Sequence, residues 1–279
     1  TPTCRGVDHQ ICQRAWGYHL VNDHPRIFTG RFVSLASPVV EGQTLAGIPY
    51  GSTSGSIYHN MPAFMRRVYA IPYKTFEIKD YPAKYYAIMR MATAQDVTML
   101  ATANPSSILK MCEKADENAE SIIRDIHDGT LSKDFNIAPH IRKRLEKKCK
   151  PRPYRSRWLG KVYRRRGSLR PCDYWPNLQV ICCWKGGTVG YFVNRFPFWF
   201  NPDGEREIPV RDWGLLSSEA RCSIPISDRG SAGVLAVATN FYEFVAVEDQ
   251  AANPDNPGAW TFLTVGDLKE GGEYYIFLT

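Results

Sequence analysis

Residues 82–128 constrain the fold more than any other part of the chain. Apolar side chains recur at helical spacing from 82 to 92, and small and β-branched residues predict a strand over 97–103. A second helical stripe follows over 105–126 and keeps register for about five turns. Asn104 is placed to cap that helix and Gly129 to end it. Helix, strand and helix in direct succession are typical of an α/β fold, in which helices pack on a mostly parallel sheet.

Further strands are predicted on both sides of this segment. Phe32–Ser37 is expected to be a buried strand that runs into a glycine-rich loop over 42–55, and Pro72 makes 68–76 an edge or broken strand. The second half is richer in strands, which are predicted at 178–184, 208–215, 234–245 and 274–278. Polar or glycine-rich loops follow at 185–188, 217–219 and 227–230. Ligands of open α/β sheets bind beyond the carboxyl ends of strands, so these loops are the expected binding regions.

The composition is that of a globular chain. Of 279 residues, 44% are hydrophobic, which is enough to form a large core and favours a single domain. Eight cysteines are scattered without a CxxC pair, a pattern that predicts reduced cytoplasmic thiols. No window approaches the roughly 20 uncharged apolar residues of a membrane helix, so we expect a soluble protein with no membrane partner.

Positive charge is concentrated in one strip. Residues 139–170 hold 14 Lys and Arg against Glu146 alone, a net charge of +13, so the remainder of the chain carries 7 − 13 = −6. Tyr154, Trp158 and Tyr163 are interleaved with the charges, as on nucleic-acid-binding surfaces. A solvated, mobile connection between the two halves would have the same composition, and we favour it over a nucleic-acid partner.

Four groups of residues could serve as chemical sites. The segment 50–56 resembles a phosphate loop but has no lysine, so a glycine loop with hydroxyl-capped turns is favoured. Asn104 and Ser106 lie at a helix N-terminus, where an anionic substrate group or a plain cap fits equally well. At 217–219, two hydroxyls and a carboxylate could hold phosphate and Mg²⁺, although an ordinary helix cap explains the same residues. The histidines show no metal-ligand spacing and are expected on the surface or at caps: His9, His19, His24, His59, His127 and His140.

Several long blocks, in order, resemble one family. These blocks are SPVVEGQTLAGIPYGSTSG (37–55), YAIPYKTFEIKDYPAKYYAIMR (69–90), DVTMLATANPSSIL (96–109), RDIHDGTL (124–131), DYWPNLQVICCWKGGTVG (173–190), VRDWGLLSSEARCSIPISDRGSAGVLA (210–236) and NFYEFV (240–245). They are similar to the auxin-responsive (Gretchen Hagen) acyl-acid amido synthetases, and to the bacterial members more than to the plant ones. This family is a branch of the adenylate-forming, luciferase-like enzymes.

The resemblance implies a fold, a reaction and a set of site residues. The fold is the large-domain core of adenylate-forming enzymes, and the reaction uses ATP and Mg²⁺ to join a small carboxylic acid to an amino acid through an acyl-adenylate. Ser217 and Ser218 would contact the adenylate, and Glu219 would hold Mg²⁺ as the catalytic carboxylate. Gly187 and Thr188 resemble the stretch that lines the nucleotide pocket.

The resemblance also predicts how much of the family's domain is present. Residues 1–279 match a partial N-terminal adenylate-forming domain, with 139–170 as a basic connecting segment within it. The family's phosphate-loop motif, its ribose motif and its C-terminal lid fall outside these residues, so we expect this segment alone to be inactive. The alternative function is a non-catalytic structural or nucleic-acid-binding module that uses residues 142–170.

Overall fold

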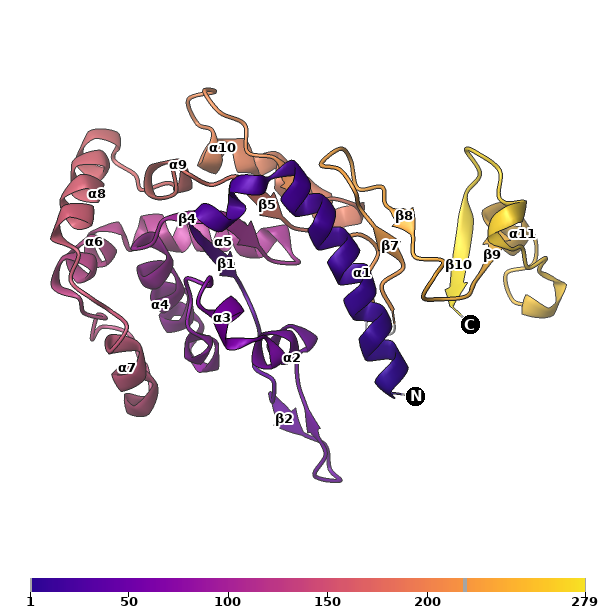
Figure 1. Cartoon of the computed structure of the whole chain (residues 1–279), viewed down its shortest axis with the longest axis horizontal. Coiled ribbons are helices and arrows are strands. Elements are labelled where there is room, and N and C mark those ends of the chain that lie inside the picture. The colour runs from indigo at the N-terminus through magenta and orange to yellow at the C-terminus, as the bar shows by residue number, and fades with distance from the viewer. Residues whose placement is uncertain (1, 218–219, 279) are drawn as a thin grey trace. The chain divides into compact units, whose positions relative to one another are not determined.

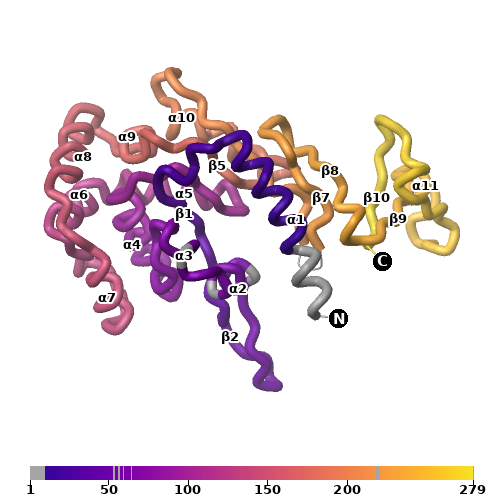
Figure 2. Tube along the Cα trace, viewed as in Figure 1, coloured from indigo at the N-terminus to yellow at the C-terminus, as the bar shows by residue number. Residues whose placement is uncertain are grey.

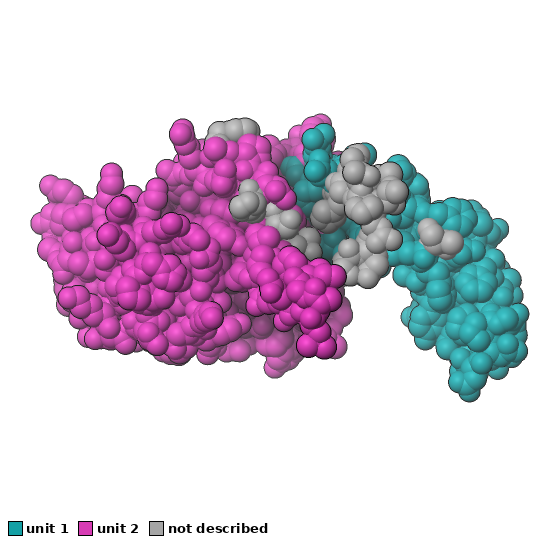
Figure 3. All heavy atoms as spheres, turned by 90° about the horizontal axis from the view of Figure 1, so that it is seen from below, with its two compact units in different colours: residues 1–17, 214–226, 233–279 teal, residues 18–213, 227–232 magenta. Residues whose placement is uncertain are grey.

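The computed structural model describes residues 2–217 and 220–278; the side chains of residues 2–9, 53, 56, 59 and 64 are not described. The chain forms two compact units, which are coloured separately in Figure 3. Unit 1 holds residues 1–17, 214–226 and 233–279, and unit 2 holds 18–213 and 227–232. Among the described residues, none of the helices combines the length and the apolar character that crossing a bilayer requires.

Unit 2 is built around a four-stranded sheet in which each neighbouring pair of strands is parallel. In spatial order the strands are β1 (Arg31–Ser34), β4 (Val97–Ala101), β5 (Val180–Cys182) and β6 (Val210–Arg211), of which Figure 1 labels the first three. All residues of β4 and β5 are buried, as expected for inner strands that are covered on both faces. The predicted α/β fold with a mostly parallel sheet is therefore confirmed.

The helices beside β4 follow the predicted sequence signals. Helix α4 (Tyr81–Thr93) begins at Asp80, whose Oδ1 accepts a hydrogen bond from the amide of Ala83 at 2.8 Å. The long helix predicted over 105–126 is instead two helices, α5 (Pro105–Glu117) and α6 (Ala119–Asp128). Asn118 separates them because its side-chain amide donates to the carbonyl of Lys114 at 2.9 Å, which takes one of the last acceptors of α5. Gly129 ends α6 with φ of 73°, as predicted.

Further helices and a hairpin make up the rest of residues 2–213. They are α1 (Pro2–Asp23), η1 (Pro25–Thr29), β2 (Gly42–Gln43), β3 (Pro49–Tyr50), α2 (Thr53–Asn60), α3 (Ala63–Arg66), η2 (Tyr73–Glu77), α7 (Pro139–Glu146), α8 (Pro153–Arg166), α9 (Pro171–Tyr174), η3 (Gly187–Arg195) and α10 (Phe196–Phe200). The main core lies among the sheet and the helices α4, α5 and α6.

The predicted glycine-rich loop over 42–55 is more regular than expected. It contains the hairpin of β2 and β3, which extends away from the sheet in Figure 2, and the start of α2, which Ser52 caps. A Cβ on Gly51 would lie 1.9 Å from the carbonyl oxygen of Val39, and one on Gly55 would lie 2.3 Å from that of Ser37. These glycines allow two backbone segments to approach closely, which is a structural role.

The basic strip is helical, so the favoured interpretation as a solvated, mobile connection is wrong. Helices α7 and α8 occupy most of it, and α8 packs against α6. Some of its arginines serve as internal donors: Arg152 Nη1 donates to the carbonyl of Ala94 at 2.8 Å, and Arg155 donates to that of Thr93. Arg142 Nη1 likewise donates to the carbonyl of Leu131 at 2.6 Å.

Unit 1 contains short antiparallel sheets. Besides residues 2–17 of α1, its elements are β7 (Ser223–Ile224), β8 (Val234–Leu235), β9 (Tyr242–Ala246), α11 (Val247–Ala252), η4 (Pro257–Ala259), η5 (Val265–Asp267) and β10 (Tyr274–Leu278). β7 pairs with β8, and β9 pairs with β10 over five residues each. The strand predicted over 234–245 is therefore two strands with different partners, whereas the strand at 274–278 has the predicted bounds.

A buried carboxylate joins α4, α6 and the segment after α6. Asp125 is 2% exposed, and its Oδ2 accepts hydrogen bonds from the hydroxyl of Tyr86 at 2.6 Å and from the amide of Ser132 at 2.5 Å. Burial and the hydrogen bond to Asp125 both raise the pKa of Tyr86, which keeps its hydroxyl protonated as a donor. Arg90, also 2% exposed, donates to the backbone carbonyl of Asp125 at 2.7 Å.

This network leads to a stability prediction. Tyr86→Phe should lower the free energy of unfolding by about 2 kcal/mol, because it removes a hydrogen bond to a buried charged group. The measurement is urea unfolding monitored by circular dichroism. Tyr154→Phe is the matched control, because that ring is 81% exposed, and it should change stability by less than about 0.5 kcal/mol. Equal effects of the two variants would contradict the role assigned to Asp125.

Candidate functional site

The carboxyl edge of the sheet brings the first residues of three loops together. Backbone hydrogen bonds continue beyond the strands: the amide of Thr102 donates to Cys182 O at 2.9 Å, and that of Trp184 donates to Ala103 O at 2.9 Å. The amide of Cys183 donates to Arg211 O at 3.1 Å in the same way. The loops after β4, β5 and β6 therefore begin side by side, at the edge where open parallel sheets bind their ligands.

Two predicted residues lie at this edge, in the loop after β4. Asn104 caps α5, because its Oδ1 accepts hydrogen bonds from the amide of Ser106 at 2.9 Å and from the hydroxyl of Ser106 at 2.8 Å. The capping interpretation is thus confirmed, and the role in binding an anion stays a prediction. Among the described residues no hydrogen bond involves Asn104 Nδ2, so this group remains available as a donor.

The loop after β5 leads into η3, which begins with Gly187 and Thr188, and the loop is held by Lys185. The Lys185 amide donates to Asp212 Oδ2 at 2.5 Å, and its ammonium donates to the carbonyls of Val210 at 3.0 Å and Asp228 at 2.6 Å. Gly187 has a φ of 58°, a left-handed conformation that favours glycine, and Thr188 is exposed. Lys185 therefore acts as a structural clamp that presents these two residues to solvent.

The remaining predicted residues belong to a different part of the chain. Ser217 lies in unit 1, and Ser218 and Glu219 lie outside the described residues. Leu216 forms an antiparallel bridge with Arg221, and the amide of Ala220 donates to Ser217 Oγ at 3.2 Å. Ser217 thus follows directly after a bridged residue, and both interpretations of 217–219 stay predictions because Ser218 and Glu219 lie outside the described residues.

A buried ionic network lies at the end of β6, and the sequence analysis missed it. Arg211 is fully buried, its Nε donates to Asp228 Oδ1 at 2.6 Å, and its Nη2 donates to Asp23 Oδ2 at 2.5 Å. His24 Nε2 contacts the other oxygen of Asp228 at 2.8 Å and its side chain is only 11% exposed; His24 occupies the N-cap position of η1, so of the two predicted places for the histidines it takes the cap and not the surface. An arginine followed by an aspartate at the end of an apolar strand is the signal that could have indicated the network.

Burial and neighbouring charged groups shift the pKa values of Asp228 and Cys183 at this edge. Burial raises the pKa of Asp228, but hydrogen bonds from His24 and Arg211 outweigh it and the pKa is lowered overall. Burial, together with the charge of Asp212, raises the pKa of Cys183 to about 12, so this thiol stays protonated. The edge therefore presents a fixed carboxylate and no thiolate nucleophile at position 183.

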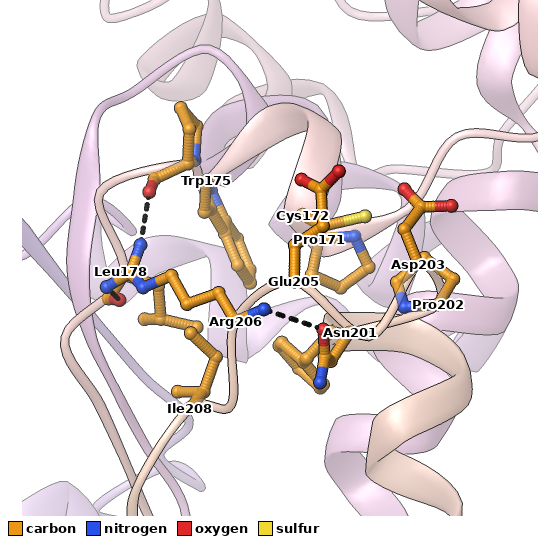
Figure 4. A pocket seen from close by; sticks show the side chains of 12 residues that line it. Pro171, Cys172, Trp175, Leu178, Asn201, Pro202, Asp203, Glu205, Arg206 and Ile208 are labelled. Atoms are coloured by element: carbon orange, nitrogen blue, oxygen red, sulfur yellow. Dashed lines mark hydrogen bonds between the residues drawn. The ribbon is translucent and has the colours of Figure 1, made fainter.

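A pocket of about 180 Å³ lies at the opposite edge of the sheet (Figure 4). Leu178 and Ile208, which precede β5 and β6, line it together with Trp175 and Cys172. Arg206 borders it but donates to the backbone carbonyl of Pro176 at 2.6 Å, and burial raises the pKa of Cys172 to about 11. The pocket holds none of the predicted site residues.

Metal-ligating side chains do not cluster within the described part of the chain, where no group of three or more His, Cys, Asp or Glu could hold an ion. The seven cysteines with described side chains are free thiols, in agreement with the prediction of reduced cysteines.

A family model for the GH3 family N-terminal domain matches residues 1–204. The chain belongs to the GH3 family. This confirms the family resemblance of the sequence blocks, whereas the closer likeness to bacterial members stays a prediction. A search of curated protein sequences finds no match to this GH3 chain.

Solved structures share the fold of the GH3 chain. A GH3.15 acyl acid amido synthetase superposes with a TM-score of 0.75 at 15% identity, covering 95% of this chain and 46% of that protein. The AtGH3.15 acyl acid amido synthetase in complex with 2,4-DB gives 0.75 at 17% identity, covering 98% and 47%. At these identities the likeness establishes the fold alone, and the chain spans about half the length of these proteins.

The ionic network of the GH3 chain predicts a pH-dependent stability. Asp228→Asn should lower the free energy of unfolding at pH 7 by about 2 kcal/mol, because the fully buried Arg211 loses one of its two carboxylates. The lowered pKa of Asp228 means that its contribution is present above the unfolded pKa of about 3.9 and is lost as the pH falls through the folded value.

The measurement is urea unfolding of both proteins from pH 7 down to pH 3. The difference between parent and variant should be full at pH 7 and should shrink below about pH 4. Glu205→Gln serves as the control, because that carboxylate is exposed and forms no ion pair among the described residues. A difference that stays constant down to pH 3 would disprove the assignment.

Proposed function

We propose that this GH3 domain is the core of an ATP-dependent acid–amino acid ligase. In the first step a carboxylate oxygen of the acid attacks the α-phosphorus of ATP, which forms the acyl-adenylate and releases pyrophosphate. In the second step the amino acid's amine attacks the acyl carbon, which forms the amide and releases AMP and a proton. The match of the GH3 N-terminal domain model to residues 1–204 is the observation that carries the proposal.

The carboxyl edge of the sheet suits the first step. The N-terminus of α5 is the positive end of the helix dipole, which favours a carboxylate or phosphate. Asn104 can cap the helix through Oδ1 and donate to an anion through Nδ2, so the two roles predicted for it are compatible. Gly187 and Thr188 would line the nucleotide pocket from the loop that Lys185 clamps.

The metal would be held by Glu219. Mg²⁺ is usually bound through one or two carboxylates together with phosphate oxygens, and a carboxylate beside two hydroxyls fits that requirement. Ser217 and Ser218 would contact the adenylate, and Ser217 is an exposed residue. When bound, the metal would neutralise charge on the triphosphate as pyrophosphate leaves.

The substrates are proposed by class only. The complex of AtGH3.15 with 2,4-DB concerns that protein, and for this chain we propose a small carboxylic acid and an amino acid, without assuming auxin. A cytoplasmic location is proposed as well, because ATP and free cysteines are both expected in that compartment.

Replacing the proposed metal ligand tests the function. In the full-length protein, Glu219→Gln should reduce acid-dependent exchange of pyrophosphate into ATP by at least about a hundredfold, because a lost charge contact in a transition state costs about 3 kcal/mol. Glu270→Gln, an exposed carboxylate in the same unit, is the matched control and should exchange normally. Normal exchange by the Glu219 variant would remove this residue from the site.

A second pair of variants separates capping from binding at Asn104. Asn104→Asp should keep the stability of the domain, since Asp caps as well as Asn, whereas Asn104→Ala should lose about 1 kcal/mol. In the exchange assay Asn104→Asp should raise the KM for the acid or for ATP, because a negative charge replaces the donor Nδ2. If Asn104→Asp leaves both KM values unchanged, Asn104 is a cap alone.

A further inference from the structure

Helix α8 presents an unusual exposed face. Its 14 residues include six basic side chains and no acidic one. Apart from Arg166, the exposed positions hold two aromatic rings and four cations at helical spacing: Tyr154, Arg157, Trp158, Lys161, Arg164 and Arg165. We call this set the α8 face.

The opposite side of the helix fixes this orientation. Leu159 is fully buried and Val162 is 9% exposed, and the helix packs against α6. The Ser156 hydroxyl donates to the carbonyl of Ile123 in α6 at 2.8 Å. The basic and aromatic side chains are therefore held outward by the packing of the helix.

The cations of the α8 face form no ion pair among the described residues, although Arg165 lies close enough to Asp203 to help lower the pKa of that carboxyl. Arg166, next along the helix, pairs with Asp173 at 3.2 Å and with Asp203 at 2.6 Å. Within the described ranges, by contrast, no carboxylate lies within 4.0 Å of the four cations of the α8 face. Lys147, Lys148 and Lys150, just before α8, are also exposed and add to the positive potential.

The two rings are exposed beside guanidinium groups. Tyr154 is 81% exposed, with Arg157 positioned 4.7 Å from its ring centroid, and Trp158 is 41% exposed, with Arg155 at 5.3 Å. An exposed ring beside a cation can stack on a nucleobase while the cation meets the adjoining phosphate.

We propose that the α8 face binds single-stranded nucleic acid, with phosphates on its four cations and bases stacked on Tyr154 and Trp158. From position 154 to 165 the helix rises about 16 Å, or about five phosphate spacings of a stacked strand. This proposal is independent of the ligase function, because none of the six residues is assigned to that site.

The composition of the face argues against the two closest alternatives. An interfacial membrane helix needs an apolar side to enter the acyl boundary, but the exposed positions of α8 hold no aliphatic residue. A duplex offers phosphates to the cations, but its paired bases are stacked internally and leave the rings without partners. A single strand offers phosphates to the four cations and unpaired bases to the two rings.

The test measures binding of a short fluorescent oligo-uridylate and of oligo-thymidylate to the full chain, from about 50 to about 200 mM salt. A charge variant carries Arg157→Gln, Lys161→Gln and Arg165→Gln, and a ring variant carries Tyr154→Ala and Trp158→Ala. A control carries Arg14→Gln, Lys133→Gln and Lys269→Gln, which are exposed cations elsewhere and give the same loss of net charge.

The charge variant should flatten the slope of log affinity against log salt by about 2, since each phosphate contact contributes about 0.7 for single strands. The ring variant should keep the slope and weaken binding about tenfold for each ring. No binding at low salt would overturn the proposal, as would equal losses in the control and charge variants. Tighter, charge-variant-sensitive binding to phosphatidylserine vesicles or to duplex DNA would overturn it in favour of that partner.

Discussion

The parallel pairing of β4 with both of its neighbours is the constraint on which the rest of unit 2 depends. A strand buried on both faces needs backbone partners on each side and helices above and below. Every residue of β4 is buried, and the strand pairs with β1 on one side and β5 on the other. Because all four strands run the same way, their following loops meet at one edge. The placement of Asn104 and Gly187 at that edge therefore follows from the sheet.

The ionic network at the end of β6 is the second organising feature. Arg211 has no exposure to water, so its charge requires the carboxylates of Asp23 and Asp228. This requirement ties the end of α1 to the loop 227–232, which is far away in sequence but belongs to the same unit. A residue that would be costly to bury alone thus determines the path of two surface segments.

Local signals could be predicted from the sequence, and distant partnerships could not. The cap at Asn104 and the end at Gly129 depend on neighbouring residues and were predicted correctly. The break at Asn118 was missed because the apolar stripe stays in helical phase across it. The role of Arg211 was missed because its partners lie 188 and 17 positions away. At the candidate site, Asn104 could be found from helix signals, whereas Ser217, Ser218 and Glu219 were indicated by family resemblance and stay predictions.

The clamp formed by Lys185 has a consequence for ligand capture. A glycine-containing loop is ordinarily costly to order, and that entropic cost lowers the affinity of whatever it binds. Here one side chain and one amide anchor the loop to β6 and to the loop 227–232 before any ligand arrives. Most of the entropic cost of ordering the loop therefore arises during folding and not on binding. Residues 187 and 188 can then bind a ligand in a preorganised conformation.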